Sequence, residues 1–165
     1  MSLFRRVKRA LQTSRRAPGW PALTMLFWWN GIRGVVIAFL KLAYRMRMEG
    51  AEHVPDSGPI IYVANHQSHY DPCIVGALVG DRPLSGMARA TLFHTPILAW
   101  IMRGIGVIAL DQSKGDAGAF KAALGELQAG RCVLIFPEGS RTRDGAIHEF
   151  KPGVALIIRR SGALV

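Results

Sequence analysis

The chain has 165 residues, of which 50% are hydrophobic and 19% charged, so it fits one domain and excludes disordered and collagen-like classes. Its two cysteines have no metal-binding spacing and are too few for a disulfide scaffold, which agrees with a reducing compartment. The whole net charge of +10 lies in residues 1–48, with ten bases and no acid, because residues 49–165 hold eleven of each.

Residues 1–48 are predicted to form a helical segment that associates with a membrane. Six bases before residue 17 precede an apolar, tryptophan-rich stretch over residues 20–40, and further bases follow it. A nucleic-acid-binding arm does not end in an apolar block of this size, so we expect no nucleic-acid partner. No small-residue cleavage site follows the stretch, which argues against a secretory signal peptide. The flanking bases favour anionic lipid at the cytoplasmic face of the cell membrane.

The apolar stretch over residues 20–40 can meet a membrane in two ways. As one helix it would be just long enough to cross a hydrocarbon core of roughly 30 Å. Arg33 near its middle is costly in hydrocarbon, and Pro21 and the glycines at 31 and 34 favour a break. We therefore expect two short interfacial helices, broken at 30–34, with tryptophans at headgroup depth. A spanning helix and a plain core helix are the alternatives.

From residue 49 onward the sequence predicts one α/β domain. Strand patterns occupy residues 59–64, 85–89, 106–110 and 131–136, and a further strand begins at 163–165. Helical patterns occupy residues 71–79, 95–102, 116–128 and 152–161. Alternation of strands with helices predicts a mostly parallel sheet flanked by helices. Because the chain stops where a strand begins, we expect the domain over residues 49–165 to be incomplete at its C-terminus.

Two local expectations concern the helix over residues 71–79 and the cysteines. Asp71 is expected to cap this helix, with Pro72 at its first helical position. Cys73 falls on an apolar face of the helix and Cys132 falls inside a strand. Both are expected to be buried hydrophobic side chains and not nucleophiles.

The first polar cluster, residues 65–71, directly follows the strand over 59–64, at the strand end where α/β proteins bind ligands. His66 precedes Asp71 by five positions across a strand-to-helix turn. A carboxylate there can hold one imidazole nitrogen and leave the other free to accept a proton. Two alternatives stay open. Asp71 could serve only as a cap beside an ordinary loop histidine, or His66, His69 and Asp71 could bind a metal ion.

The second polar cluster, residues 137–145, follows the strand over 131–136. Gly139 lets the backbone approach a ligand closely. Arg141 can bind a phosphate with its planar guanidinium, and the N–H groups of the loop can assist. The alternative is a solvated turn in which Glu138 and Arg141 pair with each other. This cluster alone therefore predicts an anion site and nothing more specific.

Together the two clusters resemble the motifs of the 1-acylglycerol-3-phosphate acyltransferase family of glycerolipid acyltransferases. Residues 65–71 match its N-H-x-x-x-x-D motif, and residues 136–141 match its F-P-E-G-[ST]-R motif at about the right separation. Residues 106–111 resemble its middle motif, and residues 150–153 its F-K-x-G motif. The resemblance covers roughly residues 50–165.

The sequence departs from the family pattern in two places. The middle motif usually ends in Asp-Arg, but here Asp111 is followed by Gln112. In the family that arginine is thought to help hold the phosphate of the acceptor, so the departure bears on acceptor identity. The fourth, Pro-rich motif should follow residues 163–165 and is missing, which supports the expectation of a truncated domain.

The resemblance implies transfer of a fatty acyl group from acyl-CoA or acyl carrier protein to the hydroxyl of a membrane lysophospholipid. Acylation of 1-acyl-sn-glycerol-3-phosphate to phosphatidic acid, in phospholipid biosynthesis, is the most direct reading, with no metal or cofactor beyond the acyl donor. The resemblance implies that His66 and Asp71 are catalytic and that Asn65, Asp111 and Lys151 support them. It also implies that the acceptor phosphate is bound by a second group of residues, Glu138, Gly139, Ser140 and Arg141.

Three alternatives to this activity stay open. The enzyme could use another lysolipid acceptor, or the chain could be an inactive membrane-binding fragment. A metal-dependent phosphoesterase using His66, His69 and Asp71 is the third.

Overall fold

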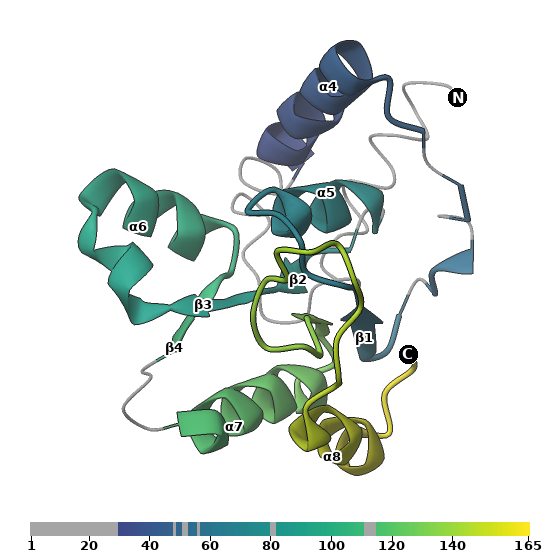
Figure 1. Cartoon of the computed structure of the whole chain (residues 1–165), viewed down its shortest axis with the longest axis vertical. Coiled ribbons are helices and arrows are strands. Elements are labelled where there is room, and N and C mark those ends of the chain that lie inside the picture. The colour runs from purple at the N-terminus through teal and green to yellow at the C-terminus, as the bar shows by residue number, and fades with distance from the viewer. Residues whose placement is uncertain (1–29, 48, 51–52, 56, 80–81, 111–114) are drawn as a thin grey trace.

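A computed structural model describes residues 30–47, 49–50, 53–55, 57–79, 82–110 and 115–165 (Figure 1). Residues 1–29, which carry most of the expected membrane-associating segment, lie outside the described residues. Asp111 and Gln112, where the sequence departs from the family's middle motif, also lie outside them.

Every described strand pairing is parallel, which confirms the predicted α/β class. One sheet has the order β1-β5-β2, and a second joins β3 to β4. The strands are β1 (Ile60–Val63), β2 (Leu84–Ser85), β3 (Met87–Arg89), β4 (Ile108–Leu110) and β5 (Cys132–Ile135). A strand was expected to begin at 163; in its place Leu164 forms one isolated parallel bridge to Ile60, at the open edge of β1.

The single strand predicted over residues 85–89 is wrong, because this segment divides between the two sheets. Leu84 and Ser85 pair with β5, whereas the residues from Met87 onward pair with β4. Between them, the carbonyl of Gly86 accepts the N–H of Ile108 at 2.8 Å and so already belongs to the second sheet. A strand this short can change partners because few backbone hydrogen bonds hold it to either sheet.

The helices predicted from residue 71 onward are present, with boundaries shifted by at most two residues. In chain order the α-helices are α4 (Arg33–Tyr44), α5 (Asp71–Leu78), α6 (Pro96–Gly104), α7 (Gly115–Gln128) and α8 (Pro152–Ser161), with a 3₁₀ turn, η3 (Ala90–His94), before α6. Helix α8 ends as predicted at Gly162, whose φ of +61° suits a residue without a Cβ.

Alternate residues of the central strands face opposite sides of the sheet, and helices cover both sides. Figure 1 shows α5 on one side and α7 with α8 on the other. One buried cluster packs against α5 and contains Ile60, Val79, Leu84, Cys132 and Leu134. The other is built with α7 and α8 and contains Ile61, Ala123, Leu127, Val133, Ile135 and Ile157.

The central strand β5 places the two polar clusters side by side. It pairs in parallel with β1, with Val63 opposite Ile135 at their carboxyl ends. Residues 64–70 leave β1 and residues 136–151 leave β5 at this same edge of the sheet. The expectation that each cluster follows the carboxyl end of a strand is therefore confirmed, and the structure shows that the two strands are neighbours.

The described part of the N-terminal segment is helical where a break was expected. A π-helical turn over residues 30–32 leads directly into α4, so a break within 30–34 is wrong for these residues. Glycine lowers helix stability by about 1 kcal/mol but does not remove a backbone donor, and Arg33 ties α4 to α5 by donating to the carbonyl of Ala77 at 3.2 Å. Among the described residues, no helix has the length and apolar character to cross a bilayer.

The two cysteines differ in burial. Cys132 is fully buried in β5, as expected. Cys73 is exposed, so its predicted burial is wrong. The buried residue of α5 is Ala77, which lies one turn later on nearly the same face, so the start of this helix is more exposed than its end.

Candidate active site

His66 and Asp71 meet across the turn between β1 and α5. His66 Nδ1 lies 2.9 Å from Asp71 Oδ2, and the two side chains are 19% and 18% exposed. The same carboxylate oxygen accepts the backbone N–H groups of Gln67 and Ser68, each at 2.7 Å. The predicted contact between imidazole and carboxylate is therefore present.

Asp71 is not the cap that the sequence predicted. Tyr70 occupies the cap position, Asp71 is the first residue of α5, and no side chain caps the helix. Its carboxylate turns back to the preceding loop, where three donors converge on it: the imidazole and two backbone N–H groups. This geometry contradicts the alternative in which Asp71 serves only the helix.

The carboxylate of Asp71 is held in its ionised form. Partial burial raises its pKa, but hydrogen bonds from Ser68, the His66 ring and Gln67 outweigh that effect and lower the pKa below its ordinary value of 3.8. An ionised carboxylate can only accept, so it selects the tautomer in which His66 Nδ1 carries the proton. Nε2 of His66 is then left with a lone pair that can take a proton from a substrate.

Phe136 fixes the other face of the imidazole and was not predicted as a site residue. Its ring stacks on that of His66, with centroids 4.0 Å apart and planes inclined by 18°. Phe136 opens the F-P-E-G-[ST]-R motif directly after β5. Its place next to a polar cluster could have indicated a role in the site, but an aromatic residue at the end of a strand is more often part of the core.

The loop after β5 also holds the main chain of His66. Glu138 is buried, with 8% exposed, and its Oε1 accepts the N–H of His66 at 3.3 Å. The N–H of Thr142 donates to the carbonyl of His66 at 2.8 Å. In the described part of the chain no ion pair joins Glu138 to Arg141, so the alternative of a self-paired turn is not supported.

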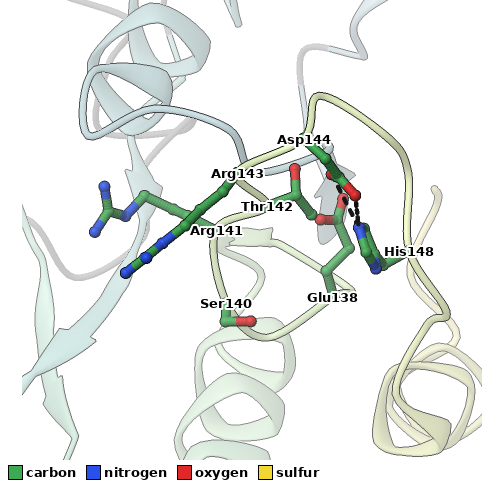
Figure 2. A pocket seen from close by; sticks show the side chains of 7 residues that line it. All are labelled: Glu138, Ser140, Arg141, Thr142, Arg143, Asp144 and His148. Carbon is green, nitrogen blue, oxygen red and sulfur yellow. Dashed lines mark hydrogen bonds and ion pairs between the residues drawn. The ribbon is translucent and has the colours of Figure 1, made fainter.

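A pocket of about 330 Å³ lies along this loop (Figure 2). In Figure 2 the side chains of Arg141 and Arg143 extend to the same side of the loop, away from Asp144 and His148, which pair at 3.0 Å. Two guanidinium groups beside hydroxyl groups form a site suited to an oxyanion. The lining residues are Glu138, Ser140, Arg141, Thr142, Arg143, Asp144 and His148.

Lys151 lies across Gly139, at the point where the pocket loop turns. Gly139 has a φ of +72°, and a Cβ built there would lie 2.9 Å from Lys151 Nζ and closer still to its Cε. The N–H of Lys151 also donates to the carbonyl of Pro137 at 2.9 Å. Gly139 is therefore needed both for its backbone conformation and for the space that Lys151 fills.

We expect Gly139→Ala to destabilise the protein by about 1–2 kcal/mol through its backbone conformation alone, and further by displacing Lys151. The double variant Gly139→Ala with Lys151→Ala should recover the steric part and not the backbone part. Thermal unfolding of both variants, beside Gly145→Ala, whose Cβ would meet open space at a φ of +75°, separates the two contributions. Equal losses in Gly139→Ala and Gly145→Ala would show that Lys151 is not displaced.

The remaining candidates are placed as follows. Asn65 is exposed at the end of β1, and Ser140 and Arg141 are exposed on the pocket loop. Asp111 lies outside the described residues. In the described ranges, no three His, Cys, Asp or Glu side chains group closely enough to hold a metal ion, so His66, His69 and Asp71 do not form such a set.

Comparison with known proteins gives a consistent picture. The model of the acyltransferase family matches residues 45–165. A chloroplastic 1-acyl-sn-glycerol-3-phosphate acyltransferase of Arabidopsis thaliana is 32% identical over 125 residues, which are 74% of this chain and 35% of that protein. A lyso-ornithine lipid O-acyltransferase of Pseudomonas aeruginosa is 33% identical over 93 residues, 56% of this chain and 35% of that protein.

A solved structure shares the fold. The crystal structure of the 1-acyl-sn-glycerophosphate acyltransferase PlsC from Thermotoga maritima superimposes with a TM-score of 0.67 at 26% identity, over 81% of this chain and 55% of that one. The resemblance inferred from the motifs is thereby confirmed. The chain spans about a third of the length of the two curated relatives, at 35% of each.

Proposed function

The chain belongs to the acyltransferase family, and we propose that it moves a fatty acyl group from acyl-CoA or acyl carrier protein to the free hydroxyl of a lysophospholipid. The acceptor that fits best is 1-acyl-sn-glycerol-3-phosphate, which would be converted to phosphatidic acid for phospholipid biosynthesis. The names of the Arabidopsis and Thermotoga relatives support this acceptor. The observation that carries the proposal is His66, with Nδ1 held by Asp71, beside a pocket that contains two arginines.

The chemistry of a thioester explains why one base suffices. A thioester is already activated and its thiolate is a good leaving group, so the protein need not supply a nucleophile. Nε2 of His66 takes the proton of the acceptor hydroxyl as the oxygen attacks the thioester carbonyl. The C–S bond then breaks, and the imidazolium returns the proton to the leaving thiolate. Asp71 stabilises the imidazolium between these two events. The reaction needs no metal and no cofactor besides the acyl donor.

The pocket loop would hold the phosphate of the acceptor. Arg141 offers a planar pair of donors that matches phosphate oxygens, and the hydroxyl of Ser140 lies in the same pocket. Gly139 stays with the phosphate-binding group, and Asn65, Asp111 and Lys151 keep the supporting roles that the motifs imply. Glu138 carries the same sign of charge as phosphate, so we assign it to His66 instead, whose N–H it accepts.

We expect Arg141→Lys to raise KM for lysophosphatidate by about tenfold while leaving KM for the acyl donor nearly unchanged. Lysine cannot reproduce the bidentate geometry, and one charge-assisted hydrogen bond contributes about 1.5–3 kcal/mol. Arg159→Lys, at an exposed position of α8, is the matched control. Steady-state kinetics with each substrate varied in turn test the assignment. An equal rise of both KM values would remove Arg141 from the acceptor phosphate.

We further propose that residues 1–48 hold the enzyme on the cytoplasmic face of the membrane, where acceptor and product reside. The ten bases of this segment would attract anionic lipid. Helix α4, within the segment, exposes Val35, Phe39, Leu42 and Tyr44, of which Leu42 is the most exposed at 85%. These side chains suit burial in the interface between headgroups and acyl chains.

Binding to anionic vesicles should therefore weaken at high salt without disappearing, because salt screens charge but not apolar burial. Leu42→Asp should weaken the salt-resistant part. Val165→Asp, which places the same charge at a residue that is 69% exposed near the other end of the chain, should leave it unchanged. Co-sedimentation at low and high salt measures both parts. Equal binding by Leu42→Asp and the wild type would exclude α4 from the membrane contact.

A further inference from the structure

The loop that forms the anion pocket also sets the position of the base. Glu138 accepts the N–H of His66 at 3.3 Å, and Thr142 donates its N–H to the carbonyl of His66 at 2.8 Å. Both residues line the pocket, and Arg141 stands directly before Thr142 in the chain. We call these two hydrogen bonds the His66 clamp.

Few other contacts hold His66. Apart from Asp71, the hydrogen bonds and the ring contact described for His66 all come from residues 136–142. Glu138 has no other described hydrogen bond, and its Oε2 is buried without a partner among the described residues. The side-chain amide of the next residue, Gln67, donates to the carbonyl of Gly145 at 2.8 Å. The conformation of this loop, together with the contact to Asp71, therefore determines where Nε2 of His66 lies.

The positive charges of the pocket loop can make its conformation depend on a bound anion. Arg141 and Arg143 extend to the same side of the loop (Figure 2), and neither has an ion-pair partner in the described part of the chain. Two neighbouring guanidinium groups repel each other until an anion lies between them. A bound phosphate would bring the two arginines together, and the segment between Glu138 and Thr142 would tighten with them.

We propose that the phosphate of the acceptor, besides anchoring it, aligns His66 through the His66 clamp. This inference rests on the proposed acyl transfer and adds a positioning role for Glu138 and Thr142. Part of the binding energy of the phosphate is then used to order the base, so that it raises kcat as well as lowering KM. The aligned state is scarce without an anion and dominant with one.

If so, the phosphate and the hydroxyl need not belong to the same molecule. Inorganic phosphate should activate transfer to 1-monoacylglycerol, which is the same acceptor without its phosphate. The chemical step is the same as for lysophosphatidate. The hydroxyl proton passes to Nε2, an ester C–O bond forms, the thioester C–S bond breaks, and the thiolate takes the proton. Inorganic phosphate is unchanged at the end.

The test uses the intact protein with acyl-CoA as donor and follows ester formation on 1-monoacylglycerol with rising phosphate, against sodium chloride of equal ionic strength. We expect phosphate to raise the rate by about tenfold or more, because misplacement of a reacting group by 1 Å can cost about 10²-fold. Activation should saturate at the concentration at which phosphate competes with lysophosphatidate in a parallel assay.

Variants of the clamp separate alignment from binding. In Glu138→Leu, phosphate should still compete with lysophosphatidate at a similar concentration. The activation ratio, which is the rate of monoacylglycerol transfer with phosphate divided by the rate without it, should fall towards one. Glu138→Gln keeps an oxygen acceptor for the His66 N–H and should retain most of the activation. Glu149→Leu makes the same change at an exposed residue outside the pocket lining and is the matched control. A merely structural role of Glu138 would lower all rates together and leave the activation ratio unchanged.

With the wild type, two further results would overturn the inference, and they are distinguishable. If the wild type acylates lysophosphatidate but phosphate leaves the monoacylglycerol rate unchanged at concentrations that compete, the inference is wrong and the proposed function stands. If the wild type does not acylate lysophosphatidate at all, the proposed function fails and the inference fails with it.

Discussion

Replacing His66 by alanine is expected to lower kcat for acyl transfer by about 10²-fold or more, because a positioned general base contributes that much. The KM values for donor and acceptor should change little, since His66 acts on the proton and not on the phosphate. The fold should survive, because alanine keeps the main-chain N–H and carbonyl that bond to Glu138 and Thr142.

The release of the CoA thiol measures this loss, and thermal unfolding verifies that the variant is folded. His69→Ala is the matched control, because His69 is exposed on the same loop and is not bonded to Asp71 in the described structure. It should retain wild-type turnover. A loss in His69→Ala as large as that in His66→Ala would contradict the assignment of a single base and favour the metal-dependent alternative.

Replacing Asp71 by asparagine should lower kcat by about 10²-fold or more, because the carboxylate both selects the tautomer of His66 and stabilises its protonated form. The carboxylate faces three donors, from His66, Gln67 and Ser68. An amide carries no negative charge to stabilise the imidazolium, and its NH₂ group can turn the imidazole to the wrong tautomer. Asp71→Glu, which keeps the charge but moves it by one methylene, should lose less than Asp71→Asn. Equal losses would mean that geometry alone matters.

The same substitution should change how stability depends on pH. The pKa of Asp71 in the folded protein is lower than its ordinary 3.8, so the unfolded state binds the proton more readily. Its contribution to the free energy of unfolding is therefore complete above that ordinary pKa and is lost as pH falls through the lower folded value. The difference in unfolding free energy between wild type and Asp71→Asn should be constant at neutral pH and shrink below about pH 4. A difference that grows on acidification would contradict the hydrogen-bonded carboxylate.

The sequence was sufficient to predict the parts of the fold with strong local signals. These are the continuous apolar run of β5, bounded by Gly130 and Pro137, and the helical spacing of the apolar residues in α8. The meeting of the two polar clusters also followed from the sequence, since parallel strands bring their carboxyl ends to one edge. The split of residues 84–89 between two sheets did not follow, because a strand of two or three residues carries no period.

The site was predictable in its residues but not in all of its contacts. The spacing of His66 and Asp71 reveals their pairing because both lie on one short turn. Glu138 was assigned to the acceptor phosphate with Arg141, yet its carboxylate is bonded to the N–H of His66, 72 positions away. A contact over that distance depends on strand order, which local patterns do not encode. The stacking of Phe136 on His66 escaped prediction for the same reason.

The identity of the product tests the central claim most directly. The intact protein is incubated with 1-acyl-sn-glycerol-3-phosphate in anionic vesicles and acyl-CoA labelled in its acyl carbonyl. We expect the label to appear in phosphatidic acid, with one CoA thiol released for each ester formed, and both signals to be lost in His66→Ala. Label that appears only in free fatty acid, or phosphatidic acid that forms equally well in His66→Ala, would contradict acyl transfer by this site.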